Sequence, residues 1–272
     1  FNVDALAAAG VEAPKTWEEF ETTTAPALIE AGYIPLAQSH SPWIFVENFM
    51  SRHNLPFATN DNGYTGTDTQ ILVNSEEMKM HWTNVKEWLD EGKYAWYGAS
   101  WDDNQAPFEE GKVAIWMGSS GSFGGLMQKD LPFEFSATYL PYWEEITTEP
   151  TQTFIGGASL FAMAGKSDEE NAATAAFFEF LTSPEVQYMW HRETGYVPIT
   201  TAAYELAKED GHYDRFPAAE VGIQQLSLAS GENTKGYRMG FYPQIRDVMN
   251  REFGRILTDE TSVEAAYETI ET

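Results

Sequence analysis

The chain has 272 residues, and its 42 Asp and Glu residues against 16 Lys and Arg residues give a net charge of −26. Such an acidic chain lacks the clustered cations that hold a nucleic-acid backbone or an anionic membrane surface, so no nucleic-acid partner is expected. Hydrophobic residues make up 43% of the chain, which excludes disorder and suffices for one large or two modest domains. The absence of Cys excludes disulfides and thiolate metal sites.

Capping side chains indicate where five helices begin. A Ser, Thr or Asn side chain can accept a hydrogen bond from a free N–H at a helix start, and a carboxylate three residues later can return it. The sequence predicts one helix from Thr16 toward Gly32 and another from Asn74 toward Gly92. Three more helices are predicted to begin at Ser167, Ser183 and Thr261.

Three short apolar segments, each bounded by Gly, Pro or Ser, predict strands. They are Val113–Met117, Phe133–Leu140 and Leu160–Ala164. Helices that alternate with such strands are typical of the α/β class. Because so few strands accompany so many helices, we expect that strands completing the sheet lie outside this chain.

A turn rich in Gly and Ser, Gly118–Ser122, follows the first predicted strand and precedes a predicted helix. Backbone N–H groups at such a helix start attract anions. The turn is not a P-loop, because no Lys follows it, and its spacing departs from that of a nucleophile elbow. An ordinary turn between a strand and a helix explains these residues equally well.

Three more places have residues suited to ligand contact, and each has a simpler explanation. The glycines of Ile155–Ser159 allow close approach of the backbone, although a bulge or hinge would use them too. Tyr196 lies in a predicted turn, where its ring can also simply pack. Arg246 follows a helix start at Pro243, where the helix dipole disfavours a cation, so it indicates either a function or a surface ion pair.

The sequence offers no metal or catalytic centre. Its five His residues lack zinc-binding spacing, so no metal and no cofactor are expected. Acidic pairs such as Asp102-Asp103 resemble the carboxylates of a glycosidase, but solvated surface is the simpler interpretation in so acidic a chain. Aromatic residues such as Trp43 suit stacking on sugars or polyols, although core packing explains most of them.

Motifs in order along nearly the whole chain resemble the extracellular solute-binding proteins of ABC importers. Within that family they are most similar to the glycerol-3-phosphate-binding members of Ugp-type importers. The resemblance is carried by the following segments: Phe1–Gly10, Pro14–Phe20, Trp43-Ile44, Glu47–Phe49, Leu55–Ala58, Ser119–Ser122, Ile155–Leu160, Trp190-His191, Thr194–Thr200, Thr234–Gly236 and Pro243–Arg246.

The resemblance implies a two-lobed α/β fold, the type II periplasmic-binding-protein fold, with ligand held between the lobes. The segment resembling Phe1–Gly10 lies well inside the family's proteins, so the chain is expected to be a fragment that holds mainly the C-terminal lobe. Residues 1–150 and 196–272 would form that lobe, and residues 151–195 would be a return through the first lobe.

The resemblance also implies the ligand contacts. The expected phosphate contacts are Ser119 or Ser120, the Gly157 backbone N–H, the Tyr196 hydroxyl and the Arg246 guanidinium, and Trp43 would lie along the glycerol. His40 stands where close relatives have a second Trp. A smaller, polar residue there would admit a larger head group, such as that of a glycerophosphodiester.

We therefore expect a monomeric substrate-binding subunit of an ABC importer, which catalyses no reaction. It would bind glycerol-3-phosphate or a glycerophosphodiester and deliver it to the membrane subunits of the permease. Its location would be periplasmic or extracellular, with membrane association through the permease. The alternative is a binding protein for a neutral sugar or oligosaccharide on the same scaffold, and a remote alternative is an acid/base glycoside hydrolase.

Overall fold

Two compact units make up the chain in the computed structural model, which describes residues 1–153 and 155–271. The first unit comprises Phe1–Gly118, Leu131–Phe154 and Gln225–Thr272, and the second comprises Ser119–Asp130 and Ile155–Gln224. These boundaries differ from the lobe boundaries at 150 and 195 expected from the family. The units are defined by contacts within this chain, whereas the lobes are defined in the family's longer proteins. The assignment of segments to lobes therefore stays a prediction.

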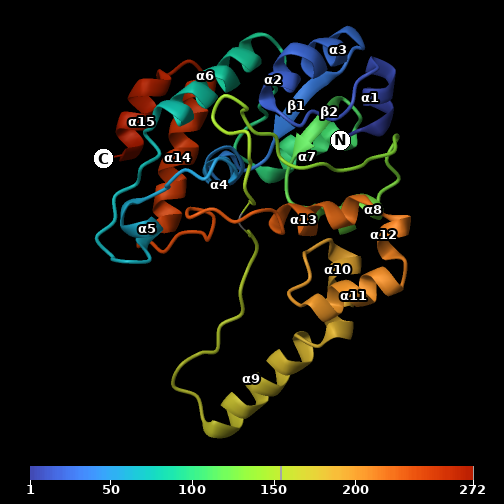
Figure 1. The fold of residues 1–272 in the computed structure, drawn as a ribbon, viewed down its shortest axis with the longest axis vertical. Coiled ribbons are helices and arrows are strands. Elements are labelled where there is room, and N and C mark those ends of the chain that lie inside the picture. Colours follow the sequence, from blue (N-terminus) through green and yellow to red (C-terminus); the bar gives the residue numbers. More distant parts are fainter. Residues whose placement is uncertain (154, 272) are drawn as a thin grey trace. The chain divides into compact units, whose positions relative to one another are not determined.

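The first unit contains the sheet and most of the helices (Figure 1). Its elements are α1 (Val3–Ala9), α2 (Trp17–Glu19), η1 (Phe20–Thr24), α3 (Ala25–Glu30), β1 (Ile34–Gln38), η2 (Pro42–Glu47), α4 (Asn48–Arg52), α5 (Thr59–Gly63), α6 (Glu76–Asp90), α7 (Trp101–Glu109), β2 (Val113–Met117), α14 (Tyr242–Leu257) and α15 (Val263–Glu271).

Two parallel strands form the sheet of this unit. Ile34 of β1 pairs with Val113 of β2, and Gln38 pairs with Met117. Helix α7 packs against both strands and α3 packs against β1. The strand β2 was predicted from the sequence and is confirmed; β1, which begins two residues after Gly32, was not predicted.

The predicted strand Phe133–Leu140 is wrong. Phe135 makes only an isolated antiparallel bridge with Asn2, flanked by backbone hydrogen bonds to Phe1 and Val3. The pairing stops there because α1 begins at Val3, where the Asn2 side chain accepts a hydrogen bond from the backbone N–H of Ala5. A helix has no free edge for a strand to extend along.

Aromatic residues dominate the core of the first unit. The ring of Trp82 on α6 stacks on that of Phe253 on α14, with centroids 4.0 Å apart. Helices α6, α14 and α15 contact one another and lie together in Figure 1. This packing fixes α14, the helix that carries Arg246, against the rest of the unit.

The second unit is helical in its described residues. Its elements are η3 (Ser120–Ser122), α8 (Phe123–Met127), α9 (Asp168–Leu181), α10 (Pro184–Thr194), α11 (Thr201–Glu209), α12 (His212–Arg215) and α13 (Ala218–Leu226), the last of which leads back into the first unit. The predicted strand Leu160–Ala164 is wrong: its side chains are exposed, and no strand among the described residues pairs with it.

Helices begin within two residues of all five predicted starts. Thr16, Ser75 and Ser167 are N-caps whose side chains accept backbone N–H bonds, and Ser167 forms a complete capping box with Glu170. Pro184 occupies the first position of α10. Among the described helices, none is long and apolar enough to cross a membrane.

Candidate ligand-binding site

In the second unit, the ring of Tyr196 lies against Gly157 and against Gly121, which belongs to the turn that carries Ser119 and Ser120. A Cβ built on Gly121 would lie 2.7 Å from the Cε2 atom of Tyr196, so the ring lies directly on this glycine. A Cβ on Gly157 would lie 3.6 Å from the Cε1 atom of the same ring. Tyr196 remains 45% exposed.

The two serines of the turn have different neighbours. The Ser119 Oγ atom caps the turn by accepting a hydrogen bond of 3.1 Å from the Gly121 N–H, which leaves its own O–H to donate elsewhere. Ser120 packs toward Gly222, where an added Cβ would lie 3.4 Å from the Ser120 Cβ atom. Which of the two serines contacts a ligand stays a prediction.

A buried histidine fixes the turn that carries Tyr196. His191 is 1% exposed, its Nδ1 atom lies 2.7 Å from the Tyr196 carbonyl oxygen, and its Nε2 atom lies 3.0 Å from the Tyr213 hydroxyl. Burial lowers the pKa of His191, so the ring is neutral at pH 7. A neutral ring with Nδ1–H donating to Tyr196 satisfies both bonds. Sequence reasoning missed this role, because only the fold brings Tyr213 to His191.

In the first unit, Arg246 is held by a buried carboxylate. Glu47, the last residue of the π-helix η2, has no exposed side-chain area and is bonded to Arg246 twice. The Arg246 Nε atom donates to Oε1 at 2.6 Å and Nη2 donates to Oε2 at 2.5 Å. The guanidinium also lies 4.9 Å from the ring centroid of Tyr242. Arg246 therefore does form an ion pair, but not a surface one: its own side chain is half-buried and that of Glu47 is fully buried.

The pair alters the protonation of both partners. Burial raises the pKa of the Glu47 carboxyl, although the hydrogen bonds and charge of Arg246 oppose the rise. Burial would lower the pKa of Arg246, but the bonds and charge of Glu47 outweigh it and raise that pKa. Arg246 is therefore always charged, and Glu47 faces a permanent cation.

His40 and Trp43 lie in the same unit as this pair. His40 adopts a left-handed backbone conformation, with φ of 58°, and its carbonyl oxygen accepts the N–H of Trp43. Burial and then the charge of Arg246 lower the pKa of His40, which is neutral at pH 7. Trp43 is half-buried, and its buried Nε1 atom has no hydrogen-bond partner among the described residues.

The structure thus brings the seven predicted residues together as two groups, one in each unit. His40, Trp43 and Arg246 belong to the first unit, and Ser119, Ser120, Gly157 and Tyr196 to the second. Contact of both groups with one ligand stays a prediction. Sequence reasoning named Glu47 only within a motif, because nothing in the local pattern pairs it with a residue 199 positions away.

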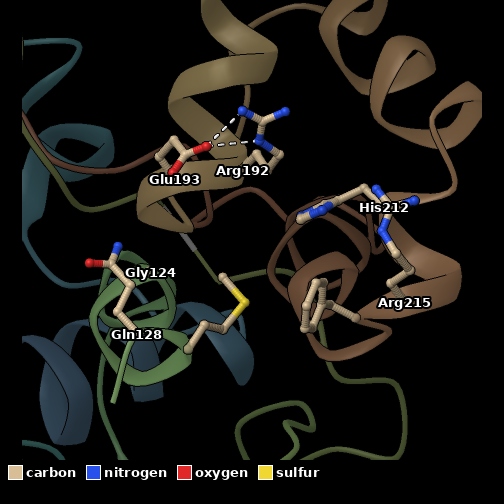
Figure 2. Close-up of a pocket in the computed structure, with 8 residues that line it drawn as sticks. Gly124, Gln128, Arg192, Glu193, His212 and Arg215 are labelled. Atoms are coloured by element: carbon tan, nitrogen blue, oxygen red, sulfur yellow. Dashed lines mark hydrogen bonds and ion pairs between the residues drawn. The ribbon is translucent and has the colours of Figure 1, made fainter. Parts of the chain in front are cut away.

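A separate cavity of about 270 Å³ lies in the second unit (Figure 2). Both of its guanidinium groups already have acidic partners: Arg192 is bonded twice to Glu193, as the dashed lines show, and Arg215 is bonded to Asp210. None of the sequence-predicted residues lines this cavity. Within the described residues, no group of three His, Asp or Glu side chains is arranged to hold a metal ion.

Comparisons with solved structures concern the fold. The structure of UgpB from Mycobacterium tuberculosis in complex with glycerophosphocholine matches with a TM-score of 0.78 and 20% identity, over 99% of this chain and 65% of that one. The maltose-bound MalE3 of T. maritima matches with a TM-score of 0.79 and 19% identity, over 100% and 68%. The expected type II α/β binding-protein fold is confirmed.

Comparisons with sequences identify the family. The sn-glycerol-3-phosphate-binding periplasmic protein UgpB of Salmonella typhimurium is 37% identical over 276 residues, and that of Yersinia enterocolitica is 36% identical over 273 residues. Each match covers 99% of this chain and 62% of the relative, so the chain spans about three-fifths of the length of these relatives. The family model described as "bacterial extracellular solute-binding protein" matches residues 1–218. The chain therefore belongs to the family of bacterial extracellular solute-binding proteins.

Proposed function

We propose that this protein is the substrate-binding subunit of an ABC importer and binds glycerol-3-phosphate or a glycerophosphodiester. The observation that carries the proposal is the identity of 37%, over 99% of the chain, to relatives named for binding glycerol-3-phosphate. The residues available for ligand contact support it, because they include a guanidinium, hydroxyl groups and a glycine backbone, all of which suit phosphate oxygens.

Each predicted residue has a separate task in this proposal. Arg246 donates hydrogen bonds to the phosphate from a guanidinium that Glu47 holds in place. Ser119, the Gly157 N–H and the Tyr196 hydroxyl donate from the second unit, and the indole of Trp43 covers the C–H groups of the glycerol. His40, which is smaller than Trp, leaves room for the head group of a diester.

The protein would bind its ligand and release it unchanged to the permease. In this proposal it acts as a monomer in the periplasm or at the cell surface, and it reaches the membrane through the permease subunits. The acidity of the chain does not prevent tight binding of a phosphate, because charges more than about 8 Å away are largely screened by salt at physiological ionic strength.

Replacement of Arg246 tests the proposal. We expect Arg246→Met to weaken binding of glycerol-3-phosphate by the full-length protein by about 100-fold or more, because the buried phosphate charge loses its cation. Calorimetry measures the affinity. Arg251→Met is the matched control, because Arg251 lies on the same helix, is 58% exposed and is bonded to a buried acid, Glu252. The double variant Arg246→Met, Glu47→Gln avoids an unpaired buried carboxylate.

Other outcomes would point elsewhere. Unchanged affinity in both Arg246 variants would remove this residue from the site. Loss of binding in Arg215→Met instead would move the ligand to the cavity in Figure 2. Tighter binding of maltose or glycerol than of glycerol-3-phosphate would favour the neutral-sugar alternative, and hydrolysis of chromogenic glycosides would favour the enzyme.

A further inference from the structure

Glu47 occupies one whole edge of the Arg246 guanidinium. Its two carboxylate oxygens accept from Nε and Nη2, and the carboxylate itself is fully buried. An Arg side chain has five N–H donors, so three of them are not used by Glu47. The paired geometry fixes the plane of the guanidinium and therefore the direction in which those three donors point.

The same contact removes the net charge from this part of the site. Besides Glu47, the titratable groups that act on Arg246 among the described residues are His40, Tyr237 and Tyr242. Burial lowers the pKa of His40 and raises the pKa of both tyrosines, so the neutral form of all three is favoured at neutral pH. Both oxygens of Glu47 accept hydrogen bonds from the guanidinium, as a carboxylate does, so the negative charge of Glu47 cancels the positive charge of Arg246.

The charge of the ligand then decides how well it is bound. The cost of removing an ion from water grows as the square of its charge, whereas its attraction to neutral dipoles grows only linearly. A site without net positive charge thus disfavours a dianion more than a monoanion. A phosphate monoester has a second pKa of about 6 and is mostly a dianion at pH 8, whereas a phosphodiester carries a single charge throughout this range.

We propose that Glu47 is a specificity-determining residue: it positions the Arg246 guanidinium with two hydrogen bonds and cancels its charge, so that the site binds phosphoryl groups that carry one negative charge. This inference rests on the proposed function and deepens it. It selects a glycerophosphodiester, or the monoanion of glycerol-3-phosphate, over the glycerol-3-phosphate dianion.

The pH dependence of binding to the full-length wild-type protein tests this directly. If only the monoanion binds, the affinity for glycerol-3-phosphate rises about 50-fold from pH 8 to pH 6, because the monoanionic fraction rises by that factor. The affinity for glycerophosphoglycerol, a diester, stays nearly constant over the same range. Calorimetry at both pH values measures the two ligands in parallel.

The variant Glu47→Gln separates charge selection from a merely structural role. Its site carries a net positive charge, so we expect the ratio of the affinity for glycerol-3-phosphate to that for the diester at pH 8 to rise about tenfold, the equivalent of 1.4 kcal/mol. Loss of positioning would weaken both ligands and leave the ratio unchanged. Glu252→Gln is the matched control, because Glu252 is also a buried acid bonded to arginines, on α14.

Distinct results overturn distinct claims. A wild-type affinity for glycerol-3-phosphate that is constant or falls toward pH 6 overturns charge selection, while binding itself still supports the proposed function. An unchanged ratio in Glu47→Gln overturns the role of Glu47. Absence of binding of either ligand by the wild type overturns both proposals. The wild-type profile decides the question even if Glu47→Gln does not fold.

Discussion

His53 shows how one buried side chain links stability to pH. Its Nδ1 atom lies 2.8 Å from the Phe49 carbonyl oxygen, and its Nε2 atom accepts a hydrogen bond of 2.8 Å from the Trp143 backbone N–H. Both ring nitrogens are therefore used by the neutral form. Burial lowers the pKa of His53 to about 4, and protonation at Nε2 would break the bond to Trp143.

We expect the protein to lose stability in mild acid for this reason. A folded-state pKa below the unfolded value of 6.5 stabilises the fold fully above pH 6.5, and that contribution disappears as the pH falls toward 4. The shift corresponds to about 3 kcal/mol. Urea unfolding at pH 7 and pH 5 should show about 2 kcal/mol of this loss, because the rest occurs below pH 5. His53→Gln should be less stable at pH 7 but lose less between the two values. An identical loss in the variant would contradict this account.

At the same scale, the sequence identified ligand-binding candidates but not the residues that support them. Tyr196 and Arg246 were recognised from a turn, from a helix start and from family motifs. Their anchors, His191 and Glu47, gave no separate signal, because each acts through a tertiary contact with a residue that only the fold brings near.

Helix α6 shows how far local chemistry determines an element. The Ser75 side chain accepts the Met78 N–H at 3.2 Å, and the buried face carries Trp82 and Trp88. Capping and the apolar period are encoded within a few residues of each other, so this helix was predicted from its sequence.

We expect Ser75→Ala to lower the free energy of unfolding by about 1 kcal/mol, because one N–H of the first turn loses its partner. Ser75→Asp should preserve most of the stability. Ser100→Ala is the control, since Ser100 is the N-cap of α7 but makes no side-chain capping bond. Chemical unfolding of the three variants measures the difference, and equal losses in Ser75→Ala and Ser100→Ala would argue against the cap.

Strands were predicted less well than helices, again for a physical reason. An apolar run becomes a strand only where a partner offers free N–H and C=O groups. Val113–Met117 has β1 as its partner, whereas Phe133–Leu140 meets a segment that turns into α1 at once. Local composition cannot distinguish these two cases.

At the scale of the whole molecule, the chain's charge of −26 would oppose encounter with the anionic ligand of the proposed function. The field of the protein repels a phosphate at long range, and salt screens that repulsion. We expect the association rate of glycerol-3-phosphate to rise about threefold or more between roughly 10 and 150 mM salt, while that of uncharged glycerol stays constant. Stopped-flow tryptophan fluorescence measures both rates. A rate that falls with salt would mean that Arg246 dominates the field along the ligand's approach.

The sequence alone determined the acidity of the chain, its helix starts, its α/β class and its resemblance to solute-binding proteins, because each depends on composition or on residues close together along the chain. Tertiary structure decided which arginine has a buried carboxylate and which tyrosine rests on a glycine. Those pairings join residues far apart in sequence, such as Glu47 and Arg246. Contacts of this kind depend on the path of the whole chain, and no local pattern encodes them.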